Sequence, residues 1–260
     1  MKIGMFDSGI GGLTVLQKAI EMMPGEEYHY YADVDHVPYG SKTVEEIQMY
    51  SGAATNFLIE KGCDVVVIAC NTATSAACRM LRGMVDTPLV GIEPAVKPAV
   101  EREEERKVLV IATPVTVREP KLHDLVLRVD TRHQVELKAL PGLVDFAEHG
   151  VFEGDEVDAY LKEELASFSW DEYGVLVFGC THFNHFAKSL RKVTGPGVKM
   201  IDGSAGTVRR AGDLTRPCPS EGLATPVIHY YQSGREVTDQ KTLTFYSNVL
   251  IHLKQMQEYM

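Results

Sequence analysis

The chain has 260 residues, of which 45% are hydrophobic and 24% are charged, which is typical of a globular protein with one large or two ordinary domains. Its formal net charge of -10 argues against nucleic acid or an anionic membrane surface as a partner. No apolar run is long enough for a transmembrane helix, and the N-terminus lacks the pattern of a secretory signal. The five cysteines follow neither the spacing of a disulfide framework nor the CxxC spacing of a metal site. We therefore expect a reduced, cytoplasmic protein without a bound metal.

The chain begins with a predicted apolar strand at residues 2–6, and a glycine-rich turn at residues 7–12 then opens a helix. The glycines would allow the backbone to approach a ligand closely. Their spacing matches neither a dinucleotide-binding fingerprint nor a P-loop. Asp7 lies at the end of the strand, where it could orient or charge a neighbouring group or, alternatively, cap the helix.

A second strand is predicted at residues 27–32, followed by a polar loop at residues 33–42. Within this loop, a turn with free backbone N–H groups and hydroxyls could bind the polar tail of a ligand, or it could simply be exposed. The turn consists of Pro38, Tyr39, Gly40 and Ser41.

A run of β-branched residues at positions 65–68 predicts a strand buried on both faces, as in parallel sheets. Cys70, Asn71 and Thr72 follow this strand, and we expect a helix from about residue 73 to residue 83. Open α/β sheets bind ligands at the carboxyl ends of their strands, and a helix N-terminus favours an anion such as a carboxylate. Cys70 is therefore a candidate catalytic thiol, although a buried free cysteine can also be purely structural.

The second half of the chain repeats this plan. An apolar strand at residues 175–178 precedes Cys180, Thr181 and His182. In each half, an opening strand (residues 2–6 or 108–112) precedes the cysteine-bearing strand by a similar number of residues. We interpret this pattern as a two-fold repeat at domain scale with one thiol in each half. Two thiols that face each other across a cleft could remove a proton from a carbon atom and return one on the opposite face.

The other segments alternate between helices and strands, which predicts an α/β fold with mainly parallel sheets. Glu148 and His149 form a titratable pair in a short helix that Gly150 ends. The remaining predicted elements are helices at 43–61, 95–105, 118–129, 156–169, 183–193, 207–214 and 242–260, strands at 88–92 and 134–139, a loop-rich stretch at 216–226 and an edge strand at 229–231.

Four motifs occur in a fixed order, and together they resemble those of the glutamate racemases, cofactor-independent enzymes that supply D-glutamate for bacterial cell walls. The motifs are DSGIGG (7–12), VPYGSK (37–42), ACNTA (69–73) and GCTH (179–182). The resemblance spans nearly the whole chain. It implies two pseudo-symmetric α/β domains with the active site in the cleft between them. Residues 1–94 plus 205–260 would form the first domain, and residues 95–204 would form the second.

The resemblance also implies the roles of individual residues. Cys70 and Cys180 would be the acid/base thiols, with Asp7 as the proton partner of Cys70 and with Glu148 and His182 as the partners of Cys180. A thiolate can serve as the base because helix N-termini and polar neighbours lower a thiol pKa, and we expect such positions for both cysteines. The implied substrate contacts are Asp7, Ser8, Pro38, Tyr39, Gly40, Ser41, Asn71, Thr72, Thr181 and His182.

The resemblance implies glutamate as the substrate, neither cofactor nor metal, and a homodimer or a monomer–dimer equilibrium. Three other functions remain open. A racemase of the same family could act on aspartate or another small acid, although the turn at residues 38–41, which the family places at the substrate tail, favours glutamate. The chain could also be a non-catalytic amino-acid-binding protein. A cysteine hydrolase would need only one nucleophile and a base, and it would leave the second thiol unexplained.

Overall fold

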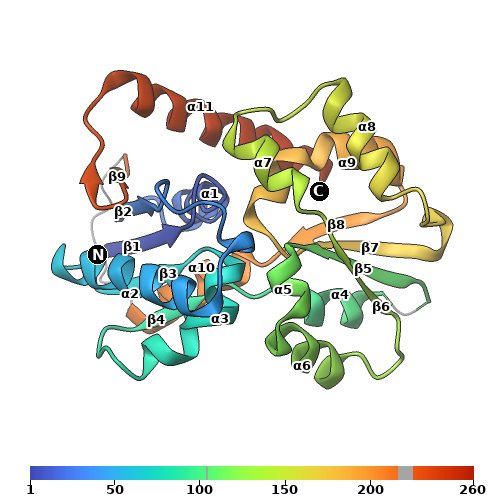
Figure 1. Ribbon diagram of the computed structural model, residues 1–260, viewed down its shortest axis with the longest axis horizontal. Helices are drawn as coiled ribbons and strands as arrows, with labels where there is room; N and C mark the ends of the chain where they lie inside the picture. Colours follow the sequence, from blue (N-terminus) through green and yellow to red (C-terminus); the bar gives the residue numbers. More distant parts are fainter. Residues whose placement is uncertain (104, 216–224) are drawn as a thin grey trace.

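The computed structural model describes residues 1–103, 105–215 and 225–260. Its helices surround two sheets that lie side by side along the long axis of the molecule (Figure 1). The strands are β1 (Lys2–Asp7), β2 (Glu27–Ala32), β3 (Val65–Ile68), β4 (Leu89–Gly91), β5 (Lys107–Ala112), β6 (Val135–Ala139), β7 (Tyr173–Phe178), β8 (Lys199–Asp202), β9 (Val227–Gln232) and β10 (Arg235–Glu236).

The helices follow the strands in sequence and pack on both sheets. The α-helices are α1 (Leu13–Met22), α2 (Val44–Glu60), α3 (Asn71–Arg82), α4 (Val96–Arg102), α5 (Pro114–Arg118), α6 (Pro120–Val129), α7 (Gly142–Glu148), α8 (Asp155–Glu164), α9 (Ala187–Thr194), α10 (Ser204–Thr215) and α11 (Gln240–Met256). The 3-10 helices are η1 (Tyr39–Ser41), η2 (Trp170–Glu172), η3 (Thr181–Phe186) and η4 (Gln257–Tyr259). Across the described ranges, no helix combines the length and apolarity that a membrane span requires.

The strand orders are β10-β9-β2-β1-β3-β4 in the first sheet and β6-β5-β7-β8 in the second. All neighbouring strands are parallel except β9 and β10. The order β2-β1-β3-β4 therefore recurs as β6-β5-β7-β8, which confirms both the predicted fold class and the predicted two-fold repeat.

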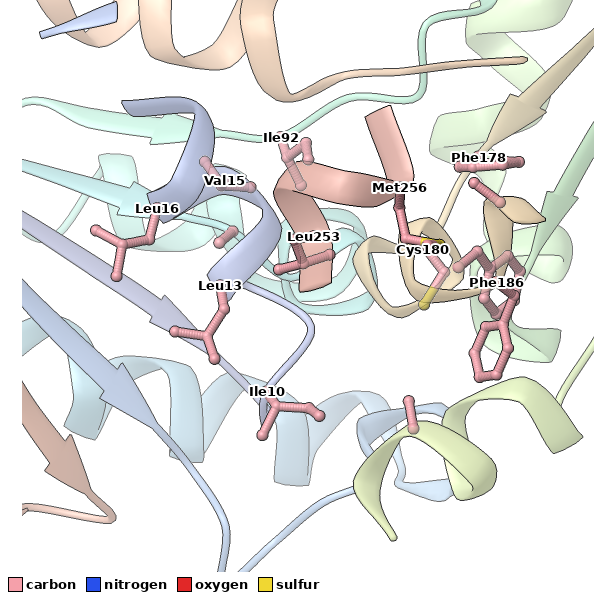
Figure 2. Packing of buried hydrophobic residues seen from close by; sticks show 14 of the residues in the cluster. Ile10, Leu13, Val15, Leu16, Ile92, Phe178, Cys180, Phe186, Leu253 and Met256 are labelled. Carbon is pink, nitrogen blue, oxygen red and sulfur yellow. The ribbon is translucent and has the colours of Figure 1, made fainter. Parts of the chain in front are cut away.

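Each sheet is covered by helices on both faces, which explains why the central strands carry unbroken runs of apolar residues. Alternate residues of β3 point to opposite faces: Val65 and Val67 pack with residues of α1 and α10, whereas Val66 and Ile68 pack with residues of α2 and α3. One hydrophobic cluster continues from α1 across α11 to η3 and the second sheet. Figure 2 shows Leu253 of α11 between Leu13 of α1 on one side and Phe186 of η3 on the other. This apolar contact holds the two halves together on the α1 side.

The two cysteine-bearing strands end in equivalent surroundings. β3 pairs with β1, and β7 pairs with β5. The next residue, Ala69 or Gly179, donates a backbone hydrogen bond to the carbonyl oxygen of Phe6 (2.8 Å) or Ile111 (2.7 Å). Each cysteine follows that residue directly. The chain therefore leaves the two sheets at matching points, with one thiol at each.

Several predicted elements need correction. The predicted helix 118–129 begins only at Pro120, as α6, and Arg118 instead ends the separate helix α5. The two helices do not join because Pro120 has no N–H group with which to continue the first helix. The predicted helix 183–193 begins as the 3-10 helix η3 and becomes α-helical only at Ala187. The predicted strand 229–231 is confirmed as part of β9, but it is not an edge strand, since β9 pairs with β2 on one side and with β10 on the other.

Other helix ends differ from the prediction by a few residues. The predicted helices 95–105 and 156–169 end earlier, at Arg102 and Glu164. Glu104 in the first of these predicted helices lies outside the described residues. So does most of the loop predicted at 216–226, including Cys218.

Candidate active site

Cys70 and Cys180 line the same cavity at the carboxyl ends of β3 and β7. The cavity has a volume of about 20 Å³, which is on the order of the space that one water molecule needs. An amino acid is much larger than this cavity. The other lining residues are Ser8, Pro38, Tyr39, Gly40, Asn71, Thr72, Thr113, Val144, Thr181 and His182.

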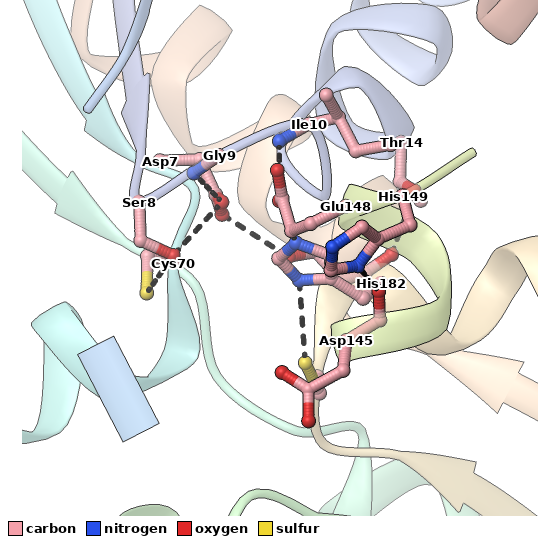
Figure 3. A network of polar contacts seen from close by, with 12 residues as sticks. Asp7, Ser8, Gly9, Ile10, Thr14, Cys70, Asp145, Glu148, His149 and His182 are labelled. Carbon is pink, nitrogen blue, oxygen red and sulfur yellow. Dashed lines mark hydrogen bonds and ion pairs between the residues drawn. The ribbon is translucent and has the colours of Figure 1, made fainter. Parts of the chain in front are cut away.

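Cys70 occupies the N-cap position of α3, and its sulfur accepts a hydrogen bond from the backbone N–H of Ala73 at 3.3 Å. The helix therefore begins at Asn71, two residues before the predicted start. The Cys70 thiol also lies 4.0 Å from Ser8 Oγ, and Ser8 Oγ lies 3.4 Å from Asp7 Oδ1. Figure 3 shows this chain of polar contacts from Cys70 through Ser8 to Asp7.

Asp7 is completely buried, and it contacts the other half of the protein. Its carboxylate accepts hydrogen bonds from Gly9 N–H (3.0 Å) and from the hydroxyl of Thr181 (3.1 Å). The alternative that Asp7 caps α1 is wrong, because the N-cap residue is Gly12 and no side chain caps this helix. Burial raises the pKa of Asp7, while nearby His182 acts in the opposite direction. Asp7 is thus a carboxyl group that can hold a proton close to Cys70.

The expectation that a helix N-terminus lowers the thiol pKa is wrong for Cys70. Burial raises this pKa above its usual value, and the neighbouring Asp7 carboxyl raises it further. These effects outweigh the hydrogen bond from Ala73 N–H, which acts in the opposite direction. The raised pKa of Cys70 therefore favours its protonated thiol form.

Cys180 has different neighbours. Its sulfur lies 3.6 Å from Nδ1 of His182, and Nε2 of the same ring lies 2.6 Å from Oε1 of Glu148. Burial lowers the pKa of His182, but the hydrogen bonds to Cys180 and Glu148 outweigh burial and raise that pKa well above its ordinary value. The His182 ring therefore lies between the carboxyl group of Glu148 and the sulfur of Cys180, and it holds its proton more firmly than an ordinary imidazole does. The residues that follow Cys180 form the 3-10 helix η3 rather than the α-helix N-terminus that was expected.

The glycine-rich turn packs directly on this Cys180 cluster. A Cβ atom at Gly9 would collide with the carboxylate of Glu148, and one at Gly11 would collide with the ring of His182. The backbone N–H of Ile10 donates to Glu148 Oε1 at 2.9 Å. In this structure, the close approach that these glycines permit is to Glu148 and His182.

The predicted polar contacts differ in how they are placed. The side-chain oxygen and nitrogen of Asn71 are buried and have no hydrogen-bond partner among the described residues. An unpaired buried amide is destabilising, by roughly 1–3 kcal/mol, so Asn71 at the cavity wall is suited to a polar ligand.

Other predicted contact residues are already paired or lie away from the cavity surface. The hydroxyl of Tyr39 donates to Asp33 at 2.7 Å. Ser41 is exposed, donates to the carbonyl oxygen of Pro38 at 3.0 Å, and does not line the cavity. Asp7 and Glu148 also lie behind the lining residues rather than among them.

Sequence reasoning missed two lining residues, Thr113 and Val144. Thr113 follows β5 directly, as Ser8 follows β1, and its hydroxyl lies 3.0 Å from the hydroxyl of Thr72. The two-fold repeat contained the signal for Thr113, because it aligns Ser8 with Thr113. Nothing in the sequence pattern around Val144 indicates a cavity wall.

The fold and the buried cluster of thiols, carboxyls and imidazole define a two-sheet α/β enzyme with acid–base groups between its halves. The chain belongs to the Asp/Glu/Hydantoin racemase family, whose sequence pattern matches residues 11–211. It is 47% identical over 265 residues to a glutamate racemase of Campylobacter curvus (strain 525.92), with 99% of each chain covered.

Two solved structures extend the comparison. A glutamate racemase from Campylobacter jejuni subsp. jejuni superimposes with a TM-score of 0.81 at 28% identity and covers 96% of this chain and 97% of its own. The Escherichia coli glutamate racemase in complex with L-glutamate and the activator UDP-MurNAc-ala superimposes with a TM-score of 0.79 at 27% identity, covering 94% of each chain.

Proposed function

We propose that this protein is a glutamate racemase that interconverts L- and D-glutamate and so supplies D-glutamate for peptidoglycan. The observation that carries the proposal is the position of two thiols, one from each half, on a single cavity. The relatives support the choice of substrate, since the Escherichia coli protein was solved with L-glutamate. Glutamate racemase is also the name of the Campylobacter curvus relative at 47% identity.

In the proposed mechanism, one cysteine removes the Cα proton as a thiolate and the other donates a proton to the opposite face as a thiol. The imidazolium of His182 would stabilise negative charge on the sulfur of Cys180, with Glu148 holding the ring in place. On the other side, Asp7 would take up and return the Cys70 proton through Ser8. The thiols exchange their roles when the opposite enantiomer reacts.

The substrate would contact groups that the cavity presents from both halves. The α-carboxylate would lie over the first turn of α3, whose free N–H groups stabilise the charge that develops when the Cα proton leaves. The amide of Asn71 would gain the hydrogen bonds that it lacks. Further proposed contacts are Asp7, Ser8, Thr72, Thr181 and His182, with Pro38, Tyr39, Gly40 and Ser41 at the substrate tail.

We propose that the two halves move as domains, with residues 1–94 plus 205–260 in the first and residues 95–204 in the second. The small cavity supports this, because glutamate enters only when the halves separate. Closure would then exclude water and strengthen the polar contacts around the carbanion-like state.

We also propose that the protein is cytoplasmic and forms a homodimer or a monomer–dimer equilibrium. Light scattering after gel filtration over a range of concentrations would measure its oligomeric state.

Circular dichroism of L- and D-glutamate with the purified protein tests the reaction. Cys70→Ala and Cys180→Ala should each slow racemisation by roughly 10³-fold or more, since each removes one acid/base group. In D₂O, each variant should exchange the Cα proton of one enantiomer only, because one thiol still reaches one face. Cys63→Ala is the matched control, since Cys63 is buried but does not line the cavity. Full racemisation by either single-cysteine variant would contradict the mechanism.

A cysteine hydrolase is the second candidate function, because Cys180, His182 and Glu148 lie in the order of a nucleophile, base and orienting carboxylate. A hydrolase would form an acyl-enzyme on Cys180 and would not need Cys70. Mass spectrometry after reaction with an activated ester, together with the activity of Cys70→Ala, distinguishes the two functions.

Two further alternatives have their own tests. Parallel assays with aspartate test whether the protein is a racemase for another small acid. Glutamate binding without exchange of the Cα proton would indicate a non-catalytic binding protein.

A further inference from the structure

Three side chains that are typical metal ligands converge on one face of the first sheet. Glu27 and His29 lie two residues apart on β2, so they point to the same face. The parallel register pairs His29 with His229 of β9. One ligand atom from each of the three lies within 4.8 Å of the other two. Glu27 begins β2, whereas the thiols lie at the carboxyl ends of the strands, so this cluster is separate from the catalytic cavity.

The ligand atoms have a spacing that suits one metal ion. Oε1 of Glu27 lies 3.0 Å from Nε2 of His29 and 3.4 Å from Nε2 of His229. Tetrahedral zinc with bonds of about 2.0–2.1 Å places its ligand atoms about 3.3 Å apart. Both Nε2 atoms approach the same carboxylate oxygen, and the two rings are stacked with centroids 4.7 Å apart. The two Nε2 atoms therefore lie on either side of one carboxylate oxygen of Glu27.

The surroundings of the cluster also fit a metal site. His29 is buried, and its Nδ1 lies 3.1 Å from the hydroxyl of Tyr231, the kind of outer hydrogen bond that orients a metal-binding imidazole. His229 is partly exposed, which leaves a path for an ion and a place for a water ligand.

One cation competes for the carboxylate. Lys2 Nζ lies 3.7 Å from Oε1 of Glu27, but the Lys2 side chain is 44% exposed, so it can move into solvent when a metal binds. Lys2 is therefore expected to weaken metal binding without preventing it.

We propose that Glu27, His29 and His229 bind a divalent transition-metal ion of the zinc class, with solvent as the fourth ligand. Two imidazoles and one carboxylate favour zinc and its neighbours over calcium or magnesium. The ion would join β9, from the C-terminal part of the chain, to β2. Because it lies at the opposite end of the strands from the thiols, its role is structural rather than catalytic.

The test uses the full-length protein after treatment with a chelator, with Zn²⁺ and Co²⁺ as the probes. Zn²⁺ should raise the thermal midpoint in a concentration-dependent way. Co²⁺ should produce visible d–d absorption without the ultraviolet charge-transfer band of a thiolate ligand, which excludes binding to the cysteines. Glu27→Gln and His229→Ala should each weaken binding by at least 10-fold, whereas Lys2→Ala should tighten it several-fold.

Circular dichroism of the metal-free variants confirms that they fold, and the partly exposed positions Glu27 and His229 are chosen for that reason. Racemase activity of His229→Ala without metal should equal that of the parent protein, so failure of this site and failure of the proposed function are distinguishable. The proposal is overturned if neither ion binds, if Co²⁺ shows a thiolate band, or if binding is unchanged in both Glu27→Gln and His229→Ala.

Discussion

The two thiols share a backbone position but not a chemical environment. Cys70 and Cys180 both follow a central strand by two residues, and the strands around them have the same order. Cys70 caps an α-helix and connects to a buried carboxyl group through a serine hydroxyl. Cys180 precedes a 3-10 helix and contacts an imidazolium held by a carboxylate. The repeat thus provides symmetric geometry, and a few sequence differences between the halves give each thiol its own polar neighbours.

These differences are visible when the halves are aligned. Asp7 ends β1, whereas Ala112 ends β5, so only the first half has this carboxyl group. His182 lies four residues after β7, and the matching position after β3 is Thr72. A two-base reaction benefits from this difference, because one thiol must be deprotonated while the other retains its proton.

After the two cysteine variants, the largest effects are expected from Asp7→Asn and His182→Asn, which each remove one proposed proton partner. We expect each variant to lower kcat by roughly 100-fold or more, as is typical for the loss of a group that assists proton transfer. The two enantiomers have equal free energy in water, so kcat/KM must fall equally in both directions. The asymmetry should appear in the isotope effect of Cα-deuterated glutamate.

Asp7→Asn should increase the isotope effect for the enantiomer whose proton Cys70 removes, and His182→Asn should increase it for the other. The exchange measured with Cys180→Ala identifies which enantiomer reacts with Cys70. If both variants increase the effect for the same enantiomer, the assignment of separate proton partners is wrong.

A smaller effect is expected from Gly11→Ala, which tests the contact between the glycine-rich turn and the Cys180 cluster. The added methyl group would collide with the ring of His182, so the imidazole should shift and kcat should fall by roughly 10–100-fold. The change in isotope effect should match that of His182→Asn. Gly206→Ala in α10 is the control, since a Cβ atom there meets nothing within 4 Å and activity should be retained. Equal activity of the two variants would show that the turn does not position His182.

The smallest effect concerns stability and compares two histidines of η3. His182 is paired, whereas both ring nitrogens of buried His185 lack a partner among the described residues. Burial lowers the pKa of His185 well below its ordinary value, and nearby His252 acts in the same direction. The folded state therefore takes up this proton less readily than the unfolded state. The contribution of His185 to stability is complete above about pH 6.5 and is lost as the pH falls.

His185→Phe should keep the stacking on Phe152 but remove this titration. Urea unfolding between about pH 7.5 and 5 should show a smaller loss of stability for the variant, by up to about 1.4 kcal/mol per pH unit. His252, whose pKa burial also lowers, remains in both proteins and contributes equally. If the free energy of unfolding depends on pH equally in both proteins, the loss of stability at low pH does not come from His185.

The sequence alone determined the fold class and the positions of both thiols, because these depend on local patterns. The β-branched run of β3 reports burial on both faces, and its repetition at β7 reports the symmetry of the sheets. The paired cysteines could therefore be predicted before any contact was known.

The neighbours of each thiol are brought together only by the tertiary structure, and before it they could be named only from the family resemblance. Ile10 and Glu148 are 138 residues apart, and Asp7 and Thr181 are 174 apart, so no local pattern links them. The same holds for His29 and His229, which lie 200 residues apart and are brought together by strand register alone. The raised pKa of Cys70 likewise depends on burial, a property of the packed protein rather than of the residues beside it in the chain.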